Sequence, residues 1–177
     1  MLFAKYFTLA AAALAAQVTA LPSTFSSVPE ALGDLDPISA SIEGLSQRIA
    51  QSPGGITELM SITNDIYDVC DMAKKGRARF DGMAPFSKQE ELEGRPHIER
   101  LITGLTSAMG ATSTKVPLIK AVPGGTLVAK RVASRVNEEK TGFESSLQKK
   151  CSAEGFSEFR DGMNEFDKKF DALMAQL

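Results

Sequence analysis

The C-terminal part of the chain shows the most regular pattern of hydrophobic and polar positions. Apolar residues recur there every three or four positions, the spacing that keeps side chains on one face of an α-helix. Charged residues such as Glu158, Asp161 and Lys168 occupy intervening positions. The pattern predicts a long amphipathic helix whose bulky apolar face needs an equally apolar cover. That face consists of Phe156, Phe159, Met163, Phe166, Phe170, Leu173 and Leu177.

The same period predicts two helices in the N-terminal half. Asp36 and Pro37 suit an N-cap and the first helical position, and the first helix is expected to end at Pro53-Gly54-Gly55. Its apolar stripe contains Ile38, Ile42, Leu45 and Ile49. A second, longer helix is expected to continue toward Phe80, with a stripe of Leu59, Ile62, Ile66, Val69 and Ala73.

A third helix is predicted after a capping box formed by Ser87 and Glu90. Gly94-Arg95-Pro96 is expected to interrupt or restart it, and its stripe contains Ile98, Leu101, Ile102, Leu105 and Met109. Residues 111–125 are rich in Pro and Gly and predict a connection, with one helical turn around Leu118 and Ile119. A fourth long helix is expected from Thr126, with an apolar side of Val128, Val132, Val136, Phe143 and Leu147.

Strand signals are almost absent, because no segment alternates apolar and polar residues for long. We therefore expect an all-α protein, an antiparallel bundle of four to five amphipathic helices whose stripes meet inside. Residues 36–177 are predicted to form this single domain, preceded by a flexible segment at 21–35.

The first twenty residues have the composition of a secretory signal peptide. Lys5 lies in a short basic start, an Ala- and Leu-rich run extends from Tyr6 to Ala16, and Val18-Thr19-Ala20 supplies small residues for cleavage. The run is too short to cross a bilayer comfortably, and no later stretch approaches the roughly 20 apolar residues that a transmembrane helix needs. We expect residues 1–20 to be removed and the protein to be secreted, either free or associated with the cell wall.

The charge of the chain excludes one class of partner. Lys and Arg number 20 and Asp and Glu 22, and loss of Lys5 with the signal peptide brings the net charge to about −3. This balance gives no sequence-wide positive field, so nucleic acid is not expected as a partner. A basic run at the end of the second helix favours the helix dipole, although contact with anionic lipid or polysaccharide is an alternative. The run contains Lys74, Lys75, Arg77 and Arg79.

No catalytic signature is present in the sequence. The Gly-x-Ser-x-Gly, phosphate-loop and His-Glu-x-x-His motifs are absent. Neighbouring acids such as Glu90, Glu91 and Glu93 lie in highly charged stretches typical of solvated faces rather than of acid–base pairs. His97 is the single histidine, and no metal-ligand spacing surrounds it. We expect a non-enzymatic protein without a cofactor or a metal.

Cys70 and Cys151 are the two cysteines of the chain. Secretion places them in an oxidising compartment, where an even number of cysteines is normally paired. We therefore expect one disulfide, which would connect the second helix to the end of the fourth. The alternative is a reactive thiol that works with His97, which would need an orienting group and an environment that lowers the thiol pKa.

The chain resembles a fungal family of small secreted helical proteins, the hydrophobic surface binding protein A and cell-wall galactomannoprotein group. The similarity lies in the signal end at Leu21-Pro22, the helix start at Asp36-Pro37-Ile38, and the closing segment from Phe156-Ser157-Glu158-Phe159 to Phe170-Asp171-Ala172-Leu173. It covers most of the chain after the signal peptide. A cysteine pair and the connection from Pro117 to Gly125 depart from the family pattern.

The resemblance implies a protein that adsorbs to hydrophobic surfaces or holds a fatty acid in an apolar tunnel between helices. Phe and Met side chains can adapt to a flexible acyl chain. Arg95, His97 and Arg100 cluster near the start of the third helix, where they would hold the carboxylate. The ligand-binding residues implied in this way are Ile66, Val69, Arg100, Leu101, Leu105, Val132, Val136, Phe159, Met163, Phe166 and Phe170.

A second function fits the same residues. The bundle could have a dry core and act as a secreted effector or antigen, an interaction module for a host protein or a cell-wall component. A continuous void among the apolar stripes favours a lipid ligand, whereas tight packing favours surface recognition.

Overall fold

The structure is a computed structural model that describes residues 28–177. The predicted signal peptide and residues 21–27 lie outside the described residues. Within them the protein is all-α and contains no strand. Five long helices and two short ones follow one another as α2 (Val28–Gly33), α3 (Leu35–Gln51), α4 (Ile56–Gly82), α5 (Lys88–Thr114), α6 (Val116–Lys120), α7 (Gly125–Lys150) and α8 (Ala153–Gln176).

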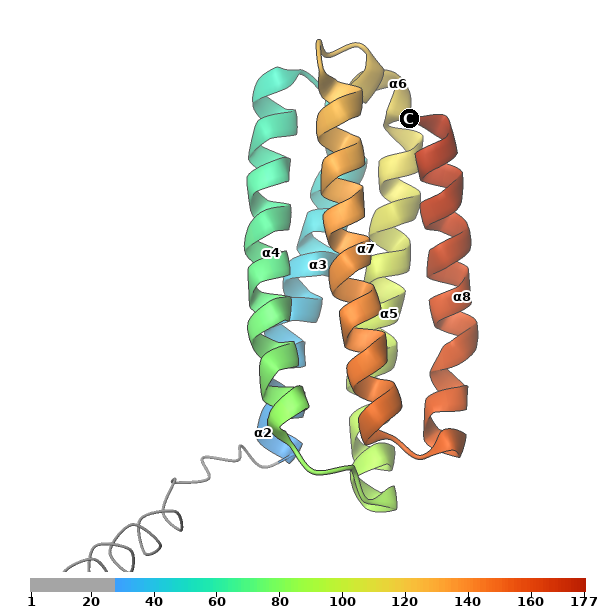
Figure 1. The fold of residues 1–177 in the computed structure, drawn as a ribbon. Helices are drawn as coiled ribbons and strands as arrows, with labels where there is room; N and C mark the ends of the chain where they lie inside the picture. Colours follow the sequence, from blue (N-terminus) through green and yellow to red (C-terminus); the bar gives the residue numbers. More distant parts are fainter. Residues whose placement is uncertain (1–27) are drawn as a thin grey trace, which may run out of the picture.

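The long helices form two layers (Figure 1). Consecutive long helices run in opposite directions, as predicted, but the helices that lie closest together run in the same direction. α3, α5 and α8 form one parallel layer, and α4 and α7 form the other. The short helix α6 lies at the end of the bundle where α4 and α7 begin, and α2 lies beside α5 at the other end.

Glycines allow the helices of the first layer to approach closely. A Cβ added at Gly104 of α5 would lie 3.2 Å from Cγ2 of Ile42 of α3, and one added at Gly162 of α8 would lie 2.9 Å from Cγ2 of Ile102 of α5. These distances are shorter than ordinary carbon–carbon contacts of about 3.5–4.0 Å. The close contacts between α3, α5 and α8 therefore require residues without a side chain at these two positions.

Polar contacts as well as apolar packing join the two helices of the second layer. Arg77 of α4 and Arg135 of α7 both pair with Glu139, at 3.3 Å and 3.1 Å. The hydroxyl of Ser146 donates a hydrogen bond of 2.6 Å to Asp81.

Several predicted local features are confirmed. Ser87 and Glu90 form the capping box that begins α5, and residues 116–120 form the expected short helix. Both Pro-Gly-Gly sequences end in helix starts, where Gly55 and Gly124 adopt φ values of 95° and 76° that favour glycine.

Three predicted boundaries differ from the structure. α3 begins at Leu35 with Asp34 at the N-cap, so the predicted N-cap at Asp36 is wrong. Residues 28–33 form α2, and the helical bundle thus starts before the expected boundary at residue 36. Pro96 lies inside α5 without interrupting it. Because proline has no N–H, the carbonyl of Leu92 loses its helical hydrogen bond to residue 96. Leu92 and Pro96 both lie on the exposed side of the helix, where water can bond this carbonyl.

The predicted disulfide is wrong, because both cysteines are free. α4 and α7 start at the same end of the bundle, so Cys70 in the middle of α4 cannot be level with Cys151 just after α7. Cys70 is level with Arg135, which lies 4.0 Å from the neighbouring Asp71. Cys151 follows Arg135 by sixteen residues, ~24 Å at a helical rise of about 1.5 Å per residue. A disulfide requires Cα atoms within about 7 Å.

The packing around glycines predicts that alanine substitutions at two sites change the free energy of unfolding in opposite directions. Gly162→Ala should lower the free energy of unfolding by about 1–2 kcal/mol, because the new methyl group meets the branched side chain of Ile102. Gly44→Ala should raise it by about 0.5–1 kcal/mol through helix propensity, because nothing lies within 4 Å of its added Cβ. Urea unfolding followed by circular dichroism measures both. A shift in the same direction for the two variants would contradict the packing.

Both thiols should be free and slow to react in the native protein. Burial raises the pKa of Cys70 to about 11 and that of Cys151 to about 11, which removes the reactive thiolate at neutral pH. Iodoacetamide should add twice to denatured protein that has never been reduced, and dithiothreitol should leave the Tm unchanged. Failure to label without reductant would show that a disulfide exists.

Candidate functional site

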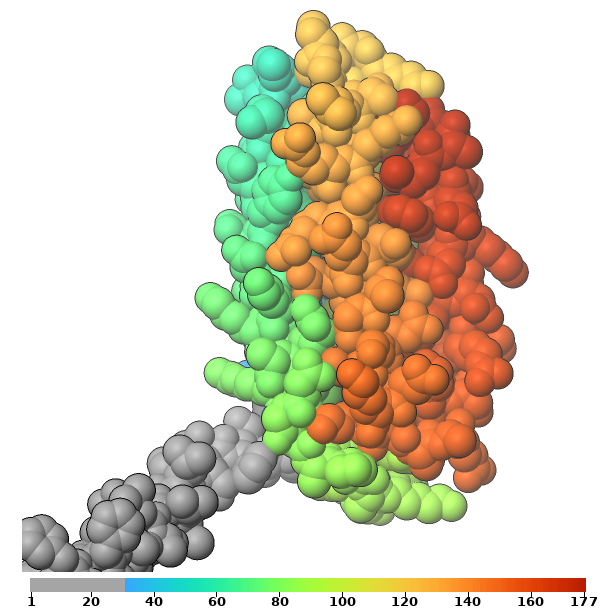
Figure 2. All heavy atoms as spheres, viewed as in Figure 1, coloured from blue at the N-terminus to red at the C-terminus, as the bar shows by residue number. Residues whose placement is uncertain are grey.

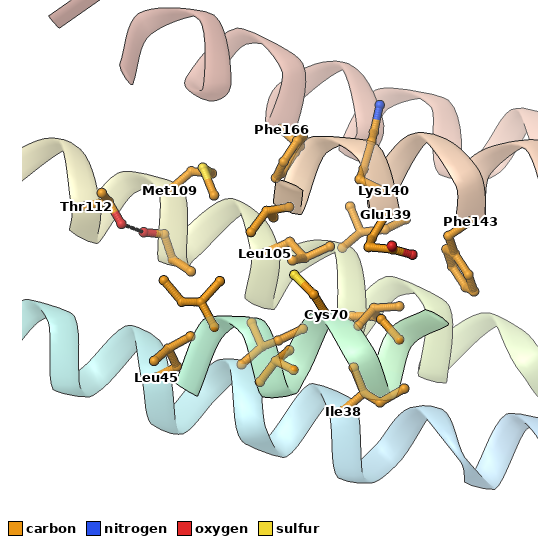
Figure 3. Close-up of a pocket in the computed structure, with 18 of the residues that line it drawn as sticks. Ile38, Leu45, Cys70, Leu105, Met109, Thr112, Glu139, Lys140, Phe143 and Phe166 are labelled. Carbon is orange, nitrogen blue, oxygen red and sulfur yellow. Dashed lines mark hydrogen bonds between the residues drawn. The ribbon is translucent and has the colours of Figure 1, made fainter. Parts of the chain in front are cut away.

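An apolar cavity lies between the two layers (Figure 3). Its volume is about 90 Å³, and all five long helices contribute to its wall. The lining extends along α3 from Leu35 to Ile49, ~21 Å at the usual helical rise. The thiol of Cys70 and the side chains of Leu105, Met109 and Phe166 face this space. We refer to it as the lower cavity.

A second cavity of about 90 Å³ continues toward the end where α4 and α7 begin. α6 and the turn at residues 52–55 form its outer wall, through Ser52, Gly54, Leu118 and Ile119. We refer to it as the upper cavity. The two cavities meet at a partition of residues that line both, namely Ile49, Ile66, Met109, Thr112 and Val136.

Aromatic packing closes the lower end of this space. Phe80 is fully buried and makes edge-to-face contacts with Phe86 and Phe143, with ring centroids 5.8 Å and 5.7 Å away. The upper end has no such cluster among the described residues, and the wall there consists of the turns and of α6. Turns and α6, rather than packed aromatic rings, therefore bound the upper end of the space.

Two charged residues of α7 interrupt the apolar wall of the lower cavity. Glu139 is 8% exposed and pairs with Arg77 and Arg135. The amine of Lys140 extends away from the centre of the cavity (Figure 3) and donates hydrogen bonds of 2.8 Å to Asp167 and 2.9 Å to Glu144.

The charge of Lys140 is fully engaged by these partners. Burial alone would lower the pKa of Lys140, but the hydrogen bonds to Asp167 and Glu144 outweigh it and raise the pKa above its usual value. A ligand carboxylate at this position would have to displace an acidic side chain. Apart from Glu139, Lys140 and Thr112, the wall of the lower cavity is apolar.

The upper cavity contains one cation without an acidic partner among the described residues. Lys115 follows α5, is half-buried and lines the cavity. Its amine donates a hydrogen bond of 3.0 Å to the backbone carbonyl of Ser52, and it forms no ion pair within residues 28–177. A carboxylate entering the upper cavity could bind this amine without breaking a salt bridge.

The structure places most of the predicted ligand-binding residues at these cavities. Val132 lines the upper cavity, and Ile66 and Val136 line both. Those that line the lower cavity alone are Val69, Leu101, Leu105, Met163 and Phe166. Phe159 and Phe170 line neither; Phe159 is buried in the core, and Phe170 stacks on Phe166 with centroids 6.3 Å apart.

The cationic cluster at the start of the third predicted helix lies outside the cavities. Arg100 donates two hydrogen bonds, of 2.7 Å and 2.8 Å, to the carboxylate of Glu43. Arg95 pairs with Glu158, and Nδ1 of His97 lies 2.7 Å from Asp36. Each of these three side chains already has a carboxylate partner on α3 or α8.

Two parts of the site are not predicted by the sequence pattern. The apolar stripe of α3 forms a large part of the lower cavity, although only the later helices were assigned to it. The connection 111–125 supplies Thr112, Lys115, Leu118, Ile119 and Val122 to the upper cavity. The absence of acidic residues beside Lys115 was a signal that could have pointed to this region.

Residues 28–177 contain no cluster of three or more His, Cys, Asp or Glu side chains that could hold a metal ion. No helix in this range is both long and apolar enough to span a bilayer. The described residues form the class of structure in which a helical bundle encloses an internal apolar space.

The chain belongs to the hydrophobic surface binding protein A family, whose family model matches residues 28–149. This confirms the resemblance seen in the sequence. No curated protein gives a significant sequence match.

Solved structures of similar fold have very different sequences. The structure of Afmp4p in complex with palmitic acid has a TM-score of 0.78 at 15% identity, over 85% of this chain and 99% of that chain. Ligand binding domain 2 of the Penicillium marneffei MP1 protein, complexed with multiple arachidonic acids, has a TM-score of 0.73 at 13% identity, over 81% of this chain and 91% of that chain. Domain 1 of the same protein, complexed with arachidonic acids, has a TM-score of 0.73 at 10% identity, over 81% and 93%.

Proposed function

We propose that this protein is a secreted, non-enzymatic carrier that binds a long-chain fatty acid or a similar apolar ligand between its helical layers. The observation that carries this proposal is the pair of apolar cavities that meet at a shared partition. The family and the fatty acids bound in structures of similar fold support it. A protein- or cell-wall-interaction module with a dry core would need no such space.

The two cavities must join to accept an acyl chain. Each measures about 90 Å³, less than the ~150 Å³ of a protein cavity that admits benzene. The partition between them contains Met109, whose unbranched thioether side chain changes rotamer easily. Rotation of Met109 and small shifts of Ile66 and Val136 would create one tunnel along the bundle.

The ligand should enter with its tail toward the aromatic cluster and its carboxylate at Lys115. The lower cavity has no free cation, because Lys140 is held by Asp167 and Glu144. Glu139 would also repel a carboxylate there. Lys115 offers its amine at the upper end, where the hydrogen bond to the Ser52 carbonyl is easily exchanged for one to a carboxylate.

Filling the partition should block the tunnel. Val136→Phe places a phenyl ring where both cavities meet, and it should weaken fatty-acid affinity at least about tenfold while the bundle stays folded. Titration with a fluorescent fatty acid measures the affinity, and circular dichroism checks the fold. Val128→Phe is the matched control, because Val128 lies on the same helix and lines neither cavity. Equal affinity of the two variants would place the ligand elsewhere.

The orientation of the ligand can be tested at its polar end. Lys115→Gln should weaken binding of a fatty acid at least about tenfold, because a charge-assisted hydrogen bond contributes roughly 1.5–3 kcal/mol. Binding of the corresponding fatty alcohol should not change. Lys74→Gln, at an exposed cation away from both cavities, serves as the control. If Lys115→Gln weakens acid and alcohol equally, the amine does not hold the carboxylate.

A further inference from the structure

Exposed apolar side chains concentrate at one end of the bundle. Leu127 is 67% exposed and Ile56 61%, and Met60 and Leu118 are exposed beside them. These residues lie on the first turns of α4 and α7 and on α6. Figure 2 shows this end at the top, where α4 begins in teal and α6 and α7 follow in gold. Leu92, the remaining large exposed apolar residue of the described chain, lies at the opposite end.

The same end is strongly basic. Residues 112–134 contain no Asp or Glu, and outside the cavity Lys120, Lys130 and Arg131 are exposed there. None of these three forms an ion pair within the described residues. Glu58, in the first turn of α4, pairs with Arg48 at 3.1 Å, and Arg48 also pairs with Asp65. We call the combination the apical surface, defined by Ile56, Met60, Leu118, Leu127, Lys120, Lys130 and Arg131.

Lys74 and Lys75 of α4 are also exposed and form no ion pair within the described residues, but no large exposed apolar side chain lies on their part of α4. In the basic run predicted from sequence, Arg77 pairs with Glu139 and Arg79 pairs with Asp34. Arg95 and Arg100 are paired with Glu158 and Glu43. The apical surface thus combines free positive charge with exposed apolar side chains.

We propose that the apical surface docks on an anionic lipid bilayer. Exposed apolar residues can enter the boundary between headgroups and acyl chains, while nearby Lys and Arg bind anionic headgroups. A neutral apolar partner would not use the cations, and a polyanion alone would not use Leu127 or Ile56. The free cations fit the anionic headgroups of a lipid layer, and the exposed apolar side chains fit the acyl region just below them.

The position of the cavity gives this docking a consequence. Leu118 belongs to the apical surface and also lines the upper cavity, together with Gly54 and Gly55 of the adjacent turn. A docked bundle would therefore hold its upper cavity against the lipid, and an acyl chain could pass between membrane and tunnel without crossing water. Docking itself does not require the tunnel, so the two proposals can fail separately.

Vesicle co-sedimentation of the purified protein tests the docking. We expect binding to phosphatidylcholine vesicles that contain phosphatidylserine, weaker binding in high salt, and at least tenfold weaker binding to pure phosphatidylcholine. The variant Lys120→Glu/Lys130→Glu/Arg131→Glu should lose at least tenfold in affinity for anionic vesicles. Leu127→Ser should weaken binding about threefold or more.

Matched controls lie on other parts of the surface. Lys74→Glu/Lys75→Glu/Lys88→Glu changes net charge equally at three exposed cations, and Leu92→Ser removes an exposed leucine from the other end. Both controls should keep wild-type vesicle binding, and all variants should keep wild-type affinity for a soluble fluorescent fatty acid. Equal loss in apical and control variants, equal binding to neutral vesicles, or no binding to either lipid would overturn the docking proposal.

Discussion

The close approach of α3, α5 and α8 is the constraint on which the rest of the structure depends. Gly104 and Gly162 let these parallel helices form a dense wall. α4 and α7 form a second layer, joined by the Arg77–Glu139 ion pair and by the packing of Phe80 on Phe143. The side chains between the layers then have to fill a gap that neither backbone can narrow. They fill it incompletely, and the remaining space is the pair of apolar cavities.

The placement of charges makes this space selective. Lys140, the cation that lines the lower cavity, pairs with Glu144 on its own helix and with Asp167 on α8. Pairing keeps the lower cavity apolar, which suits an acyl chain and disfavours a polar group. Lys115 is the exception at the upper end, where the wall is made of turns and α6. The asymmetry between a sealed aromatic end and a cationic end gives an amphiphilic ligand one preferred direction.

The sequence predicted the helices better than their arrangement. The apolar stripes, the capping box at Ser87 and the Pro-Gly-Gly turns are local signals, and they located the long helices correctly. Which helices lie side by side depends on distant contacts such as Gly162 with Ile102, which the helical period does not encode. The disulfide prediction failed for this reason, because it required Cys70 and Cys151 to lie at the same height along the bundle. Arg100 was expected to bind the ligand, but it is bonded to Glu43. The sequence alone does not show which carboxylate faces a cation.

A crystal structure of the protein with a fatty acid brominated at its terminal carbon would show whether the acyl chain lies between the two helical layers. The anomalous signal of bromine locates the tail independently of the protein density. If the ligand binds in the proposed tunnel, bromine should lie in the lower cavity near Cys70 and Phe143. The tunnel should be continuous past Met109, and the carboxylate should lie at Lys115. Bromine on the outer surface, or cavities still separate and empty at saturating ligand, would contradict the proposed tunnel.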